Sequence, residues 1–318
     1  MKAFVTGGAG FIGSTLADRL LAGGHQVTAY DNFSSGQRGF VAHNLVHPAY
    51  RLIEGDLLDE RRLADAVPGH DVVFHLAANA DVRHGLEHPR RDLEQNTIAT
   101  YNVLESMRLG SVRRILFSST GSIYGEPDVF PTPENCPFPV QTSLYGASKL
   151  AGEGLVSAYC TGYGFSGWVF RFVSILGERY THGHVFDFVR QLRADPANLR
   201  ILGDGKQRKS YLYVQDCVDA MMLALEKRPQ GYQVLNLGTD EYVSVEESVS
   251  LITRVMGVKP RLSYTGGARG WVGDSPFIFL DCAKIRALGW MPRLRIAGAI
   301  ERTTKYLLDN PSLLDRRS

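Results

Sequence analysis

A tyrosine and a lysine four residues apart, Tyr145 and Lys149, have the types and spacing that acid–base chemistry needs. They stand at the start of a predicted helix over residues 144–163, so both side chains lie on one helix face. The positive charge of the lysine stabilises a phenolate on the tyrosine. Such a phenolate takes the proton from a substrate hydroxyl while a hydride leaves the same carbon. An exposed pair on a helix surface is the structural alternative for this spacing.

Hydroxyl side chains end the predicted strand that precedes this helix in the chain. Ser118, Ser119 and Thr120 follow the apolar run 115–117. Open α/β sheets bind their ligands at the carboxyl ends of the strands. We therefore expect Thr120 to orient the oxygen that Tyr145 deprotonates.

A glycine-rich turn, Thr6-Gly7-Gly8-Ala9-Gly10-Phe11-Ile12-Gly13, joins a predicted strand over 3–6 to a predicted helix over 11–22. Gly7 permits the tight turn, Gly10 lets the backbone approach a pyrophosphate, and Gly13 lets the helix pack closely. The start of the helix then presents free N–H groups and a partial positive charge to the phosphates. Strand, turn and helix together predict a dinucleotide site.

An acidic residue, Asp31, follows the second predicted strand, 18 residues after Gly13. A carboxylate at this position accepts hydrogen bonds from the ribose hydroxyls and repels a 2′-phosphate, which favours NAD over NADP. Arg38 lies close in sequence and weakens that preference, and an Asp that caps a turn with Asn32 is the alternative.

The elements that must position these residues alternate along the first half of the chain. Apolar runs predict strands over 3–6, 26–30, 51–54, 71–75, 115–118 and 166–172, and helical patterns cover 11–22, 89–109 and 144–163. Strands that alternate with helices predict an α/β fold, a Rossmann-type doubly wound parallel sheet. We expect a dinucleotide-binding domain over 1–176 and a smaller mixed α/β substrate lobe over 177–318, with some segments, such as 211–214, that return to the first domain.

Composition excludes several classes of function. The formal net charge is +2, with 35 basic and 33 acidic residues in 318, so no electrostatic footprint for nucleic acid or a membrane surface is expected. The four cysteines have no metal-ligand spacing and predict no metal site. Reduced thiols and the strand that opens the chain, with no room for a signal peptide, favour a cytoplasmic protein.

Motifs along nearly the whole chain resemble the extended short-chain dehydrogenase/reductase superfamily, in its nucleotide-sugar epimerase/dehydratase branch. They are TGGAGFIG (6–13), YDNFSSG (30–36), GDLLD (55–59), HLAA (75–78), SSTGSIYGE (118–126), YGASK (145–149) and DGKQRKSYLYVQD (204–216).

This resemblance implies roles for individual residues. Thr120 matches the hydroxyl residue that binds the reacting oxygen, Tyr145 the base, and Lys149 its partner, which also binds the nicotinamide ribose. The residues then expected to bind NAD are Gly7, Gly10, Phe11, Ile12, Gly13, Asp31, Asn32, Ser34, Ser35, Gly36, Asp56, Leu57, Leu76, Ala77, Ala78, Asn96, Ser118, Tyr145 and Lys149.

Two positions after Thr120 separate the reactions of the branch. The 4,6-dehydratases carry an Asp-Glu pair there, and sugar-acid decarboxylases have Glu at the second position, whereas this chain has Gly121 and Ser122. Without an acid–base pair for a second reaction, the resemblance implies a 4-epimerase that acts through a transient 4-keto sugar. UDP-glucose and UDP-galactose are the leading substrates.

Three substrate positions depart from the UDP-galactose epimerase pattern. Ser174 replaces an Asn, Lys209 replaces a phosphate-binding Arg with Arg208 one step before it, and the register of Arg269 is displaced. A lysine neutralises a phosphate as a point charge and not as a two-pronged fork. UDP-sugar acids, GDP-sugars and CDP-sugars therefore stay open. The expected substrate-binding residues are Arg83, Thr120, Ser122, Tyr145, Ser174, Arg208, Lys209 and Arg269.

Other functions remain as alternatives. A dehydratase, decarboxylase or 4-dehydrogenase of the same family is one. A non-catalytic NAD-binding regulator is another, although such a protein has no use for Thr120, Tyr145 and Lys149 together. The resemblance also implies a homodimer that pairs through the helices near 89–109 and 144–162.

Overall fold

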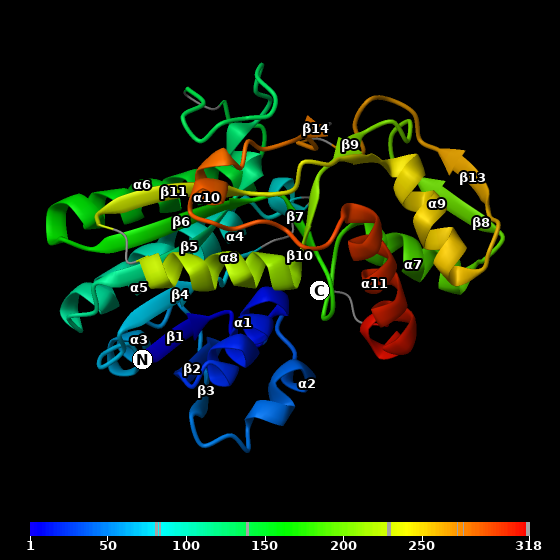
Figure 1. The fold of residues 1–318 in the computed structure, drawn as a ribbon. Coiled ribbons are helices and arrows are strands. Elements are labelled where there is room, and N and C mark those ends of the chain that lie inside the picture. Colours follow the sequence, from blue (N-terminus) through cyan, green and yellow to red (C-terminus); the bar gives the residue numbers. More distant parts are fainter. Residues whose placement is uncertain are drawn as a thin grey trace.

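A seven-stranded parallel sheet forms the centre of the computed structural model, in the order β11-β6-β5-β4-β1-β2-β3 (Figure 1). The structure describes residues 1–79, 82, 84–137, 140–227, 230–271, 273–275 and 277–315. The strands are β1 (Lys2–Thr6), β2 (Gln26–Asp31), β3 (Tyr50–Glu54), β4 (Val72–His75), β5 (Arg114–Thr120), β6 (Ser166–Phe172) and β11 (Tyr232–Leu237).

Helices cover both faces of this sheet, and successive strand residues supply the two cores. Val5 packs in a cluster with residues of α1 (Phe11–Ala22) and α8 (Val214–Lys227). Its neighbour Phe4 packs in a second cluster with residues of α3 (Glu60–Ala66), α5 (Ala99–Leu109) and α6 (Leu144–Tyr163). Alternate side chains of a strand point to opposite faces, so each face has its own core. The predicted Rossmann-type doubly wound fold is confirmed.

The second half of the chain builds a smaller lobe of short sheets and helices, which Figure 1 shows beside the central sheet. Its sheets pair β7 (Ser174–Leu176) with β10 (Tyr211–Tyr213), β8 (Asn198–Ile201) with β13 (Arg261–Tyr264), and β9 (Arg208–Lys209) with β12 (Val243–Ser244) and β14 (Phe277–Ile278). Its helices are α7 (His184–Ala194), α9 (Val245–Met256) and α11 (Ile296–Asp309), whereas α10 (Ala283–Ala287) packs against β11 at the edge of the central sheet (Figure 1).

Two further elements beyond residue 176 belong spatially to the first half. β11 pairs with β6 along its whole length, and α8 packs against α1. The segment 211–214 instead supplies β10, which pairs with β7 outside the central sheet. The domain boundary at 176 stays a prediction.

The helical run predicted over 89–109 consists of three pieces. α4 (Pro89–Asp92) leads into a π-helix, η3 (Leu93–Ile98), and α5 follows. A π-turn inserts an extra residue into the helix and is frequent at functional sites. Asn96 lies in this widened turn. The remaining short pieces are α2 (Arg38–Val41), η1 (Ala42–Asn44), η2 (His84–Leu86), η4 (Gly121–Tyr124) and η5 (Pro311–Leu313).

Among the described residues, none of the helices has the length and apolar character to cross a membrane. The same part of the chain contains no cluster of three or more histidine, cysteine or acidic side chains suited to a metal ion. All four cysteines are free thiols.

Candidate active site

Thr120, Tyr145 and Lys149 come together where β5 ends and α6 begins. The Ser143 hydroxyl caps α6 by accepting a hydrogen bond from the Gly146 N–H at 3.0 Å, which fixes the first turn that carries Tyr145. The side chain of Thr120, the last residue of β5, hydrogen-bonds Tyr145. The geometry therefore places a hydroxyl and a phenol side by side at a strand end.

Lys149 is buried one helical turn farther along α6. Its Nζ donates to the Ser118 carbonyl at 2.8 Å and lies 4.9 Å from the centre of the Phe117 ring. Burial lowers the pKa of Lys149 to about 7, although the charge of Glu153 acts in the opposite direction.

The phenol of Tyr145 differs from the expectation of a favoured phenolate. Burial raises its pKa to about 12, the charge of Asp92 raises it further, and the hydrogen bond with Thr120 lowers it. Desolvation disfavours the anion more than the surrounding side chains favour it. Lys149 alone therefore does not make Tyr145 acidic.

The glycine-rich turn packs against itself and against the end of β4. Gly7 has φ +67°, and a Cβ there would lie 2.8 Å from the Ala77 nitrogen. A Cβ on Gly13 would lie 2.1 Å from the Gly7 carbonyl oxygen. At Gly10, the N-cap of α1, the only such close neighbour is that same carbonyl, at 3.1 Å. Gly7 and Gly13 are therefore required by sterics, whereas the backbone at Gly10 is open to a ligand, with Phe11 and Ile12 beginning the helix beside it.

Asp31, at the end of β2, ties the turn to the next loop. Its carboxylate accepts hydrogen bonds from the Ala9 N–H at 2.9 Å and the Phe33 N–H at 2.8 Å. Burial raises the pKa of this carboxyl group, and the two backbone hydrogen bonds oppose that shift. Arg38 forms an ion pair with Glu54.

The other predicted dinucleotide contacts line the ends of neighbouring strands. The Asn32 amide donates to the Asp56 carboxylate at 2.9 Å, which joins the ends of β2 and β3. The Thr6 hydroxyl oxygen accepts the N–H groups of Leu76 and Ala77, both at 3.2 Å. Ser34 and Ser35 are exposed, Leu57 is buried, and Gly36 and Ala78 are partly buried.

His75 is a residue that the sequence motifs did not single out as part of the site. Its Nδ1 lies 2.8 Å from the Thr6 hydroxyl and its Nε2 lies 3.0 Å from that of Thr100. Thr100 gives its own proton to the Asn96 carbonyl, so Nε2 carries the ring proton and Nδ1 accepts from Thr6. Burial lowers the pKa of His75 to about 3, and the charge of Lys149 acts in the same direction. The neutral imidazole of His75 thus fixes the hydroxyl group of Thr6, which accepts the backbone N–H groups that follow β4.

Asn96 links the π-helix to α6. Its amide nitrogen donates to the Ser148 hydroxyl at 2.9 Å, and Ser148 donates to the Tyr145 carbonyl at 2.8 Å. Its amide oxygen accepts the Asn79 N–H at 2.8 Å. The widened turn therefore braces both the first turn of α6 and the loop after β4. Ser118 adds a further brace, since its hydroxyl donates to the His75 carbonyl at 3.1 Å.

Two of the predicted sugar-side cations, Lys209 and Arg269, lie in the second lobe beside carboxylates. Lys209 Nζ donates to the Asp274 carboxylate at 2.8 Å and also to the Ser275 carbonyl. Arg269 forms an ion pair with Glu126 and donates to the Asp274 carbonyl at 3.1 Å. Neither acidic partner was anticipated, because Asp274 lies far from Lys209 in the chain and Glu126 lies far from Arg269.

Arg208 and Lys209 occupy opposite faces of the two-residue strand β9. Arg208 stacks on Phe277, at 4.2 Å from the ring centre, and on Tyr242 at 5.2 Å. The two cations therefore do not converge on one point.

The remaining substrate-side predictions are spread around the strand ends. Ser174 opens β7 and is exposed. Ser122 lies in η4, where its N–H donates to the Thr120 hydroxyl oxygen at 3.1 Å. Arg83 lies outside the described residues.

A family model described as the NAD-dependent epimerase/dehydratase family matches residues 3–238, which include the glycine-rich turn and the Tyr145–Lys149 helix. The chain belongs to this family. The predicted membership of the extended dehydrogenase/reductase superfamily, and of its nucleotide-sugar epimerase/dehydratase branch, is confirmed.

Relatives of this NAD-dependent epimerase/dehydratase are similar over almost their whole length. A UDP-glucose 4-epimerase of Mycolicibacterium smegmatis is 34% identical over 320 residues, which cover 96% of this chain and 98% of the relative. A crystal structure of a UDP-galactose 4-epimerase is 37% identical with a TM-score of 0.87, covering 98% of this chain and 99% of that one.

Other relatives carry different reactions in their names. The UDP-glucuronic acid 4-epimerase of Bacillus cereus, solved with UDP-glucuronic acid and NAD, is 26% identical with a TM-score of 0.89, covering 98% of this chain and 100% of that one. A decarboxylase and a dTDP-glucose 4,6-dehydratase also match. The family therefore fixes the cofactor as NAD and leaves the reaction and the sugar to the residues of the site.

The residues present fit NAD. Gly7 and Gly13 keep the turn free of Cβ atoms that the backbone could not accommodate, and the start of α1 leaves its N–H groups available beside Gly10. Asp31 stands at the end of β2, where a ribose is held in this fold. Arg38, the cation nearest to Asp31 in the sequence, is paired with Glu54 on the surface.

Proposed function

We propose that the protein is an epimerase that inverts C4 of a nucleotide-diphosphate sugar through a transient 4-keto form. The observation that carries this proposal is the convergence of Thr120, Tyr145 and Lys149 beside a dinucleotide turn, with no acidic residue at the two positions after Thr120. UDP-glucose and UDP-galactose are the proposed substrates.

Each of the three side chains has a distinct task in this reaction. Tyr145 takes the proton from the sugar 4-hydroxyl and returns it, and Thr120 holds the same oxygen by a hydrogen bond. Lys149, anchored to the Ser118 carbonyl, carries its ammonium group one helical turn after the base on the same face of α6. NAD, when bound, supplies the hydride acceptor at C4, and its oxidised ring carries a positive charge that favours the phenolate of Tyr145.

Packing around Gly121 favours epimerisation over dehydration. A Cβ on Gly121 would lie 3.1 Å from a methyl group of Ile278 and 3.2 Å from the Phe172 carbonyl oxygen. A side chain at this position would need neighbours such as Ile278 on β14 to shift by a few tenths of an ångström. The second acid–base group that water loss needs therefore has no residue at this point and little room for one.

The test is a proton NMR time course of the purified protein with UDP-glucose and no added cofactor. We expect the anomeric signal of UDP-galactose to grow to a fixed ratio, because NAD is regenerated in each cycle and a retained molecule suffices. Parallel samples contain UDP-glucuronate, GDP-mannose and CDP-glucose. A 4-epimer from one of these samples alone would replace the proposed sugar and keep the reaction, whereas loss of water or carbon dioxide would contradict the proposal.

We further propose a homodimer formed through α5 and α6, as in the family pattern. Ile98 and Tyr101 are 40% and 44% exposed, and Tyr163 at the end of α6 is 51% exposed. Apolar side chains exposed on adjacent helices are typical of an interface. Light scattering is expected to give twice the chain mass, and the Ile98→Arg variant is expected to be a monomer.

The buried free thiols Cys217 and Cys282 favour a reducing compartment, and we propose the cytoplasm.

A further inference from the structure

A buried carboxylate that the proposed reaction does not use lies on the catalytic helix. Glu153 is 2% exposed and stands one turn after Lys149 and two turns after Tyr145, so the three share one stripe of α6. A charge in this position is costly unless it is paired and hydrogen-bonded. Its partners therefore show what the fold uses it for.

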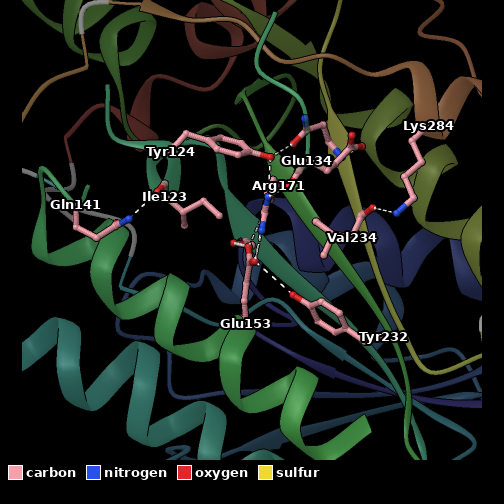
Figure 2. Close-up of polar contacts among 11 residues, drawn as sticks. Ile123, Tyr124, Glu134, Gln141, Glu153, Arg171, Tyr232, Val234 and Lys284 are labelled. Carbon is pink, nitrogen blue, oxygen red and sulfur yellow. Dashed lines mark hydrogen bonds and ion pairs between the residues drawn. The ribbon is translucent and has the colours of Figure 1, made fainter. Parts of the chain in front are cut away.

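Arg171 on β6 meets Glu153 through two parallel hydrogen bonds, which Figure 2 shows in the centre of the network. Arg171 Nη2 lies 2.7 Å from Glu153 Oε2, and Nε lies 3.0 Å from Oε1. A planar guanidinium on a carboxylate fixes the direction of both side chains as well as their separation. A buried pair of this kind is weak evidence for stability and better evidence for a defined geometry.

The same carboxylate holds the strand that ends in Thr120. The Ser119 hydroxyl donates to Glu153 Oε1, and the preceding residue, Ser118, accepts Lys149 Nζ through its carbonyl at 2.8 Å. Two consecutive residues of β5 are thus bonded to two consecutive turns of α6. These bonds fix the position of α6 relative to β5, and they thereby fix the contact between Thr120 and Tyr145.

The other end of Arg171 reaches the segments that enter the second lobe. Its Nη1 donates to the Tyr124 hydroxyl at 2.7 Å and to the Glu134 carbonyl at 2.8 Å. Tyr124 donates in turn to Asn236 on β11 at 2.8 Å. The Asn236 amide then donates to two backbone carbonyls, those of Thr132 at 2.9 Å and Asp281 at 3.0 Å.

We propose that the Glu153–Arg171 pair positions the catalytic residues by coupling the position of segments 132–134 and 279–282 to the position of α6 on β5. The expected effect on kcat rests on the proposed function, whereas the structural coupling rests on the contacts alone. Glu153 and Arg171 are positioning residues, because they act through Ser119, Lys149 and Tyr124.

Two substitutions test the structural coupling through Arg171 and the charge of Glu153 separately. Arg171→Lys keeps a cation beside Glu153 but cannot span Glu153, Tyr124 and the Glu134 carbonyl at once. We expect kcat to fall about 10- to 100-fold, as for a small misplacement of reacting groups, with KM within about threefold of the wild type. Glu153→Gln removes the charge that faces Lys149.

A direct readout that needs no substrate is the titration of Lys149 in protein labelled with [ε-13C]lysine, with Lys149→Met assigning the signal. In Glu153→Gln we expect a lower pKa for Lys149, because a negative charge that raises it has been removed. In Arg171→Lys the carboxylate remains, so the pKa of Lys149 should stay near that of the wild type. The other titratable or charged groups around Lys149 and Glu153 are His75, Asp92, Tyr124, Tyr145, Arg171 and Tyr232.

The matched control is Asp219→Asn, which removes a carboxylate paired with Arg19 at 2.6 Å and Arg293 at 3.2 Å, away from α6. We expect wild-type kcat and an unchanged Lys149 titration. The proposal is overturned if Arg171→Lys keeps kcat within about twofold, or if Glu153→Gln leaves the Lys149 titration unchanged. If the wild type acts on no nucleotide sugar, the proposed function fails, and the Lys149 titration still decides the role of the pair. If Glu153→Gln does not fold, the kcat and KM of Arg171→Lys decide it.

Discussion

The proposed cofactor side and the proposed sugar side of this molecule are built in different ways. On the cofactor side, Gly7, Gly13 and Asp31 are held by backbone sterics and backbone hydrogen bonds. On the sugar side, Lys209 is paired with the buried carboxylate of Asp274, and Arg269 is paired with the half-exposed carboxylate of Glu126. The first arrangement is fixed by the backbone, whereas the second consists of side-chain ion pairs, of which the exposed one can be replaced with little rearrangement. A family that keeps NAD and varies its sugar fits this division.

The largest expected effect comes from the residue that the two sides share. Tyr145→Phe removes the acid–base group and should lower kcat by about 10²- to 10⁴-fold, because proton transfer loses its partner. The content of bound NAD should stay at the wild-type level, since the ring and its packing remain. The NMR time course and the absorbance of the released cofactor measure both quantities. Turnover within a few-fold of the wild type would show that another group is the base.

The next effect tests the steric rule of the cofactor side. Gly13→Ala places a Cβ 2.1 Å from the Gly7 carbonyl oxygen, so the turn must open, at a cost of about 1–3 kcal/mol in the free energy of unfolding. NAD should be lost during purification.

The matched control is Gly154→Ala, on the exposed face of α6, where a Cβ meets no atom within 4 Å. This change should leave NAD in place and stabilise the fold by up to about 1 kcal/mol, because alanine favours the helix. Denaturant unfolding and cofactor content distinguish the two variants. Full retention of NAD in Gly13→Ala would contradict the steric argument.

A smaller effect is expected on the sugar side. Lys209→Met should raise KM for the nucleotide sugar about tenfold and leave kcat within about twofold. The reason is that one charge-assisted hydrogen bond from Lys209 to the nucleotide sugar is lost in the ground state and in the transition state alike. Lys206→Met, an exposed lysine three residues earlier in the same segment, is the control and should change neither value. If kcat falls while KM stays constant, Lys209 acts in the chemical step and the division between the two sides is weaker than described.

The smallest effect is a dependence of stability on pH that belongs to the cofactor side. The pKa of His75 is about 3 in the folded chain and about 6.5 when unfolded, so the unfolded state binds more protons between these values. Stability should therefore fall as the pH drops below 6.5, by about 1.4 kcal/mol at pH 5.5 from this residue. Urea unfolding of the wild type and of His75→Gln at pH 7 and pH 5.5 measures the difference. An equal pH dependence in both would contradict the assignment.

Local patterns predicted the cofactor side well. The helix predicted over 144–163 is α6, because Ser143 caps its start and Gly164, in the left-handed region, ends it. The helix predicted over 11–22 is α1, and the six predicted strands of the first half all lie in the central sheet. Each of these signals is contained within a few neighbouring residues.

Contacts between distant segments were not predictable in this way. Lys209 and Asp274 are 65 residues apart, and β9 is too short to show an alternating pattern, so neither the ion pair nor the opposite direction of Arg208 was foreseen. The role of His75 depends on threonines in two other elements. Glu153 is different, since its place four residues after Lys149 was visible in the sequence and marks the catalytic stripe of α6.

The return of β11 to the edge of the central sheet has a consequence for how the chain folds during synthesis. Until residues 232–237 leave the ribosome, β6 is an edge strand with unpaired backbone groups along one side. The same is true of one helical cover, because α8 reaches α1 only after residue 214. The sheet that holds the cofactor is therefore completed late and by the half of the chain that carries the sugar lobe. A sheet that is only partly covered at that stage is prone to association until β11 and α8 complete it.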